Sequence, residues 1–280
     1  MRRRSPRRAV TATISAVCGA VLTVALTTSP ALAADEWRQT SSRTFLLLDA
    51  LQRSQGVATD GQSWFFSWQN GLQRTTLDGS RIVDKPFAIP KRIADLGGNH
   101  IGDIDYHDGR IYAPIEDGSG YRHPFIALFD ARTLEFTGTA YELPQPLHTQ
   151  GVPWVAVDAA RGYVYTAEWN NTTALNVFAL ADLSFVKQVP LSTTVGRIQG
   201  AKMYQGRLYA SADNDRKSIY RIDPDTGVVA DVLDRDLPAG TEAEGLAFLP
   251  TADGAVLHTL DVAPSRLWVN FRNYQPVGTS

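Results

Sequence analysis

Side chains that could bind a ligand recur at matching places in five similar segments of this chain. Each segment opens with a residue directly before a glycine, and the five pairs are Gln55-Gly56, Ile101-Gly102, Gln150-Gly151, Gln199-Gly200 and Glu244-Gly245. Glutamine, which fills three of these five places, offers two donors and an acceptor without charge. If the five places converge, their side chains could hold water, a polar molecule or a metal ion.

Polar and aromatic residues close to these pairs extend the candidate site. We predict that a small polar molecule is bound by Arg53, Gln55, Gln150, Trp154, Arg197 and Gln199. Trp154 could stack on a sugar or another organic ring, although aromatic residues between strands more often belong to the core. His100 and His148 occupy nearly matching positions, so they are the candidate catalytic residues, as proton carriers, if the site is an active site.

Carboxylates follow in four of the five segments, at the end of a second apolar run. Such a set repels itself unless a cation or an arginine joins it, and Ca²⁺ prefers about six to eight oxygen ligands. We therefore predict a site for Ca²⁺ or another divalent cation at Glu244, Glu242, Glu116, Glu168, Asp213 and Asp261. The alternative is a set of loop acids paired with Arg53, Arg197 or Lys202.

The elements that position these residues follow from the repeat itself. The glycines of the five pairs are 46, 49, 49 and 45 residues apart, and each segment has a second glycine that opens a further strand: Gly61, Gly109, Gly162, Gly206 and Gly254. A period in the forties filled with short strands indicates an all-β, five-bladed β-propeller with four-stranded antiparallel blades. The start of each first strand and the end of each second strand then lie on one face, near the axis.

The ends of the chain complete this prediction. The fifth segment ends after its third strand, so residues 43–48 are expected to supply the missing strand and close the ring. This gives a flexible stretch at 34–42 and a single propeller domain at 43–280. A β-sandwich is the other fold that the strand lengths allow, but it does not require five repeats in phase.

Residues 1–33 have the features of a secretory signal peptide. A cluster of five arginines precedes an apolar stretch over 9–26, and Ala31-Leu32-Ala33 forms a cleavage site. We expect a secreted protein, exported by the Sec or the twin-arginine route. A retained membrane anchor and lipidation at Cys18 are the alternatives. The formal net charge of −2 becomes −7 when the five arginines are removed, which argues against nucleic-acid binding. After cleavage we expect a monomer that does not associate with a membrane.

Two of the segments also resemble a known superfamily. Glu244-Gly245-Leu246-Ala247, Gln55-Gly56-Val57-Ala58 and the hairpins with a turn glycine are similar to secreted bacterial propellers of the regucalcin and gluconolactonase type and to strictosidine-synthase-like proteins. The resemblance implies a divalent cation, held by Glu244, that orients a lactone or ester. Two functions stay open: a non-catalytic binding module for a small polar molecule, sugar or lactone, or a metal-dependent lactone or ester hydrolase.

Overall fold

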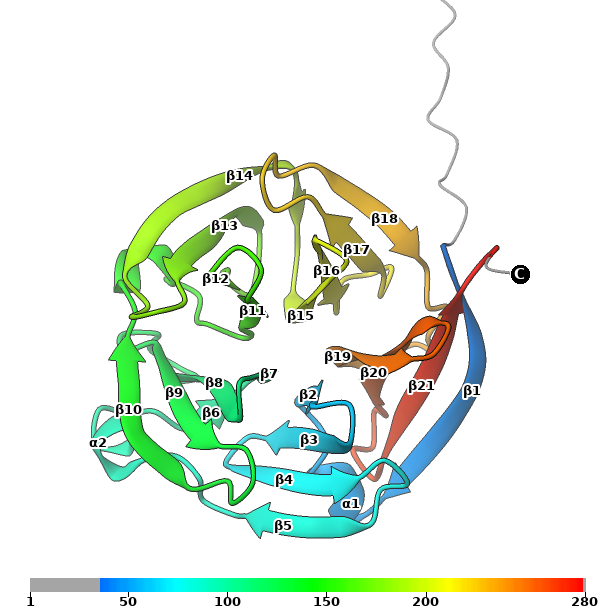
Figure 1. Ribbon diagram of the computed structural model, residues 1–280, viewed down its shortest axis with the longest axis horizontal. Coiled ribbons are helices and arrows are strands. Elements are labelled where there is room, and N and C mark those ends of the chain that lie inside the picture. Colours follow the sequence, from blue (N-terminus) through cyan, green and yellow to red (C-terminus); the bar gives the residue numbers. More distant parts are fainter. Residues whose placement is uncertain (1–35, 279–280) are drawn as a thin grey trace, which may run out of the picture. The chain divides into compact units, whose positions relative to one another are not determined.

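The computed structural model describes residues 36–278 and shows five antiparallel sheets arranged as a β-propeller (Figure 1). The predicted fold class is therefore confirmed. The predicted signal peptide, residues 1–33, lies outside the described residues. No helix among residues 36–278 is long and apolar enough to cross a membrane.

The strands follow each other outward from the axis in each blade. Blade 1 contains β2 (Gly56–Thr59), β3 (Ser63–Trp68), β4 (Gly71–Thr76) and β5 (Arg81–Lys85). Blade 2 contains β6 (His100–Ile101) and β7 (Asp105–His107), which both pair with β8 (Arg110–Glu116), then β9 (Phe125–Asp130) and β10 (Phe136–Glu142). Blade 3 contains β11 (Ala156–Asp158), β12 (Tyr163–Thr166), β13 (Thr172–Ala179) and β14 (Phe185–Val195). Blade 4 contains β15 (Ile198–Tyr204), β16 (Arg207–Ala212), β17 (Ile219–Ile222) and β18 (Val229–Leu233). Blade 5 contains β19 (Glu242–Thr251), β20 (Gly254–Val262), β21 (Trp268–Pro276) and β1 (Trp37–Leu46). The connections contain three short helices: α1 (Leu48–Leu51), α2 (Lys91–Ala94) and the 3₁₀-helix η1 (Gln145–Leu147).

Blade 5 closes the ring as predicted, because its outermost strand comes from the N-terminal side of the chain. β1 pairs with β21 from Trp37↔Pro276 to Leu46↔Trp268. The strand begins at Trp37, so residues 37–42, which the sequence led us to expect as flexible, are part of the sheet. The reason is the burial of Trp37, which is 4% exposed and packs edge-on against Tyr204 and Tyr209 of blade 4.

Five apolar clusters form the core, one between each pair of neighbouring blades. The cluster between blades 1 and 2, for example, joins Phe65 to Ile111 and Phe129. The cluster between blades 5 and 1 joins Phe271 to Phe66. Because every interface has its own apolar cluster, each blade packs against its two neighbours.

The repeated glycines allow the innermost strands to meet at the axis. A Cβ atom added to Gly245 would lie 2.9 Å from the Cα atom of Gly56, and one added to Gly200 would lie 2.7 Å from the Cα atom of Gly245. Any side chain here would strike backbone, which cannot move aside. Three of the five repeated glycines, Gly56, Gly200 and Gly245, are thus required by the close approach of blades 1, 4 and 5.

Candidate functional site

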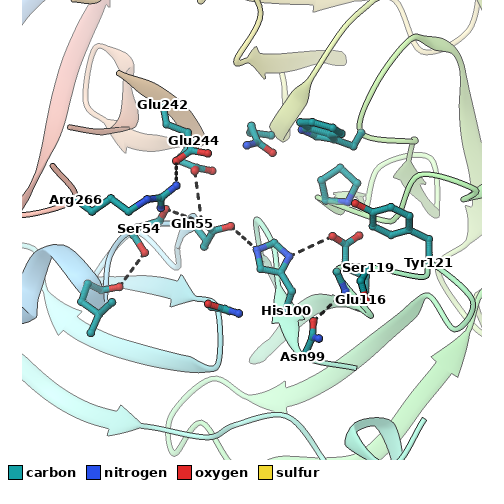
Figure 2. A pocket seen from close by; sticks show the side chains of 16 residues that line it. Ser54, Gln55, Asn99, His100, Glu116, Ser119, Tyr121, Glu242, Glu244 and Arg266 are labelled. Carbon is teal, nitrogen blue, oxygen red and sulfur yellow. Dashed lines mark hydrogen bonds and ion pairs between the residues drawn. The ribbon is translucent and has the colours of Figure 1, made fainter. Parts of the chain in front are cut away.

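A cavity of about 640 Å³ opens on the face of the ring where the innermost strands begin (Figure 2). We call this cavity the cup and define it by its lining side chains: Leu51, Ser54, Gln55, Gln69, Asn99, His100, Glu116, Ser119, Tyr121, Pro153, Trp169, Gln199, Glu242, Glu244 and Arg266, together with Gly118. Side chains from the first-strand entries and the second-strand ends therefore meet at one mouth. Strand alternation produces this convergence, because β8 ends with Glu116 at the same edge of blade 2 where β6 begins with His100.

A row of hydrogen-bonded side chains crosses the cup (Figure 2). Glu244 Oε1 accepts from Gln55 Nε2 at 3.4 Å, and Gln55 Oε1 lies 2.7 Å from His100 Nε2. His100 Nδ1 lies 3.2 Å from Glu116 Oε1. Gln55 Nε2 also donates to the carbonyl of Ser54 at 3.1 Å, which fixes the orientation of the amide. Both ring nitrogens of His100 thus face acceptor oxygens.

The two ends of this row differ in their electrostatic surroundings. Glu244 is 1% exposed, and burial raises its pKa well above the usual value; the charges of Glu242 and Asp213 raise it further. Burial thus favours the neutral form of the Glu244 carboxyl group. At the other end, Glu116 accepts hydrogen bonds from the backbone N–H of Val152 and faces His100.

Below the cup, a buried ion pair fills the axis of the ring. Asp103 Oδ2 lies 2.6 Å from Lys202 Nζ, and the two side chains are 0% and 6% exposed. Asp103 also accepts hydrogen bonds from the backbone N–H groups of Val57 (2.9 Å) and Ala201 (3.2 Å). Burial raises the pKa of Asp103 to about 7, against the opposing effect of Lys202. One carboxylate thus ties together blades 1, 2 and 4.

The sequence contains a signal for this ion pair. Asp103 follows the glycine of its segment directly, whereas the corresponding residues in three other segments are Val57, Ala201 and Leu246. A single acid at an otherwise apolar repeat position predicts a buried partner. Lys202 also lines a smaller cavity, of about 170 Å³, formed by residues farther along the inner strands. The pair therefore lies between the two cavities.

The comparisons with known proteins identify a family. A family model described as a repeat of unknown function, DUF6923, matches residues 105–252, which is more than half of the chain. The chain belongs to the DUF6923 family. The match runs from the start of β7 to just past the end of β19, so it covers blade 2 without β6, blades 3 and 4, and the first strand of blade 5. No curated protein matches the chain.

Two solved structures are similar to this DUF6923 chain. The computationally designed Ika8 protein is 12% identical, with a TM-score of 0.40, and the match covers 79% of this chain and 57% of that chain. A chain of a nidogen–laminin complex is 16% identical, with a TM-score of 0.43, and the match covers 61% and 59%. This chain spans less than two thirds of either structure. The similarity to regucalcin-type and strictosidine-synthase-like propellers stays a prediction from the sequence.

Of the predicted ligand-binding residues of the DUF6923 chain, Gln55 and Gln199 line the cup and the others do not. Arg53 is 1% exposed, donates to Gln73 Oε1 at 2.7 Å and lies over the ring of Phe45. Trp154 is fully buried in the core between blades 3 and 4. Gln150 is half-buried outside the cup. Arg197 forms an ion pair with Asp213.

The two predicted proton carriers have different places. His100 lies in the centre of the cup. His148 is 0% exposed, and its Nε2 lies 2.8 Å from Thr166 Oγ1 while Nδ1 lies 3.0 Å from the carbonyl of Pro144. Burial lowers the pKa of His148, which suits a neutral ring that supports the structure of blade 3.

The six predicted metal ligands are not gathered in one place. Glu116, Glu242 and Glu244 line the cup, but Asp261 forms ion pairs with Arg235 (3.0 Å) and Arg272. The remaining ligands are also engaged: Asp213 by Arg197 and Lys217, and Glu168 by the backbone N–H and hydroxyl of Thr149. Within residues 36–278, no group of three or more His, Cys, Asp or Glu side chains is arranged to hold a metal ion. The predicted set therefore does not fit a divalent cation.

Two aromatic side chains complete the wall of the cup. Tyr121, in the loop after β8, and Trp169, after β12, both line it. The guanidinium of Arg197 lies 5.3 Å from the ring centre of Trp169. The position of these aromatics at the mouth follows from their place directly after the second strand of their blades.

Proposed function

We propose that this propeller is a non-catalytic binding module that holds a small polar molecule in the cup. The observation that carries the proposal is the row Glu244–Gln55–His100–Glu116, because it presents oriented donors and acceptors to a cavity of about 640 Å³. Ligand cavities are commonly about 300–1,000 Å³ and use a few fixed polar groups for specificity. Export to the cell exterior belongs to the same proposal and rests on the sequence of residues 1–33.

The rigidity of the row supports binding. Gln55, His100 and Glu116 each have hydrogen-bond partners on two sides, so the geometry of the row is set before a ligand arrives, and little side-chain entropy is lost on binding. Gln199 and Asn99 line the same cup and add further neutral hydrogen-bonding groups. A sugar, a lactone or an amine could exchange hydrogen bonds with such a surface without the burial of an unpaired charge.

A thermal-shift screen with sugars, lactones and small amines tests this proposal. A ligand at 100 times its Kd stabilises the folded state by about 2.7 kcal/mol. We expect at least one class to raise the melting temperature, and this shift should disappear in Gln55→Ala and His100→Ala. The matched controls are Gln62→Ala and His123→Ala, two exposed positions away from the cup, which should keep the shift.

The same screen contains the results that would overturn the proposal. If no compound shifts the melting temperature, or if the shift survives in both cup variants, the cup is not the binding site. Turnover of a lactone or ester can be measured by the release of the acid product. If the protein shows such turnover and Glu244→Gln abolishes it, the protein is a hydrolase and not a binding module.

A further inference from the structure

An exposed apolar patch borders the cup. We call it the leucine rim: Leu46, Leu47, Leu48, Leu51, Leu267 and Trp268, whose exposed fractions range from 40 to 69%. Six of the fourteen large exposed apolar side chains within residues 36–278 are thus gathered here. Single exposed apolar residues are common, but a contiguous group on a soluble domain marks a binding surface.

The rim is one continuous surface made by three elements. Leu46 at the end of β1 pairs in register with Trp268 at the start of β21. The backbone N–H of Leu47 donates to the carbonyl of Leu267 at 2.9 Å, and α1 follows directly. The backbone itself is constrained to keep this arrangement, because Leu47 has a φ of 52°, a conformation that bulky residues rarely adopt.

The rim and the cup meet at Leu51, which belongs to both. The ion pair between Arg266, the neighbour of Leu267, and Glu242 also lines the cup (Figure 2). A molecule seated against Gln55 can therefore extend over Leu51 onto the rest of the rim. The shape of the combined site is a polar cavity with an apolar shelf along one edge.

The charges in the cup favour a cation at the polar end. Its carboxyl groups are Glu116, Glu242 and Glu244, and the guanidinium of Arg266 is already paired with Glu242. Within residues 36–278, Glu116 pairs with the imidazole of His100, and its charge also acts on Tyr121 in the wall of the cup. The rings of Tyr121 and Trp169 on the opposite wall add surfaces that attract a cation, as the contact between Trp169 and Arg197 illustrates.

We infer that the ligand is a cationic amphiphile: a small free molecule with an ammonium or guanidinium head in the cup and an apolar tail on the leucine rim. This inference rests on the proposed function and names its ligand class. The head lies near Glu116 and the aromatic wall, and the tail leaves the cup over Leu51.

Binding of primary alkylammonium ions, measured calorimetrically below their micelle concentrations, tests the inference. From butylammonium to octylammonium, each added methylene that reaches the rim should tighten binding about fourfold. Octyl sulfate, with the same tail and an anionic head, should not bind. In the double variant Leu48→Gln/Leu267→Gln the gain in affinity per added methylene should fall markedly. The control Leu77→Gln, at an exposed leucine elsewhere, should leave this gain in affinity unchanged. Glu116→Gln should weaken octylammonium about tenfold, and Glu142→Gln, at an exposed carboxylate, should not.

The outcomes separate this inference from the proposed function. If polar ligands bind in a His100-dependent manner but chain length has no effect, the inference is wrong and the proposed function stands. Equal binding of octyl sulfate would also overturn it. Two further results would assign the rim to another occupant: a dimer in sedimentation equilibrium that Leu48→Gln/Leu267→Gln dissociates, or rim-dependent binding to neutral lipid vesicles without binding of the free alkylammonium ions.

Discussion

Replacing Asp103 with alanine would leave the ammonium of Lys202 without its partner in the interior of the ring. The two groups are 2.6 Å apart, and their side chains are 0% and 6% exposed. Removing one partner of a buried ion pair costs about 3–5 kcal/mol, because the other charge stays buried and uncompensated. The variant also removes the acceptor for two backbone N–H groups, on Val57 and Ala201. For a domain of this size, we expect the melting temperature to fall by about 6–20 °C.

Urea unfolding at pH 8, where Asp103 is ionised, measures this loss. A double-mutant cycle with Lys202→Met isolates the pair: the double variant should be more stable than the sum of the single losses predicts, with a coupling of about 2 kcal/mol or more. Asp95→Ala is the matched control, since the Asp95–Lys91 pair is 59% and 87% exposed and such pairs contribute about 0–1 kcal/mol. A cost below about 1 kcal/mol for Asp103→Ala, or purely additive losses, would refute the role of this pair in joining the blades.

Two further predictions concern single side chains. Glu244→Gln should be as stable as the wild type near pH 4 and more stable at pH 8. In the wild type the pKa of the folded Glu244 carboxyl is raised above the usual 4.5, so the wild type loses stability as the pH rises through the folded pKa. Urea unfolding of both proteins at both pH values checks this. An equal difference in unfolding free energy at pH 4 and pH 8 would contradict it. Trp37→Ala should destabilise the fold by about 3–5 kcal/mol, because it empties the aromatic contact between blades 4 and 5. The control is Trp268→Ala, because the Trp268 side chain is 40% exposed; in the same assay this variant should change the unfolding free energy by less than about 1 kcal/mol. Similar losses of stability in the two variants would argue against ring closure through Trp37.

The sequence was sufficient for the architecture because the repeat and the turn chemistry agree. Asp108 and Gly109, for instance, have φ values of 47° and 72°, the left-handed pair that a tight hairpin between β7 and β8 requires. The missing strand of blade 5 could be assigned because an open sheet edge has to be covered. The start of β1 at Trp37 could not be predicted from the sequence, because it depends on a contact with blade 4 that no local sequence pattern reveals.

The candidate site was only partly predictable. Residues at the strand entry itself, such as Gln55 and His100, reach the cup because their position on the axis follows from the repeat. Arg53, two places before Gln55, lies in the turn after α1 and not in the inner strand, and it meets Gln73, a partner that the repeat does not specify. The carboxylate of Asp261 looked available for a metal because its counterions, Arg235 and Arg272, come from outside the repeated motif.

The pairing of β1 with β21 also determines when the molecule can become complete. Thr40 and Asn273 are joined by a hydrogen bond across 233 positions of the chain. β1 therefore has no partner until β21 has been synthesised. Blades 1 to 4 can form before β21 is made, but blade 5 cannot, so a product truncated before β21 would expose the unpaired edge of β1 and be prone to aggregation.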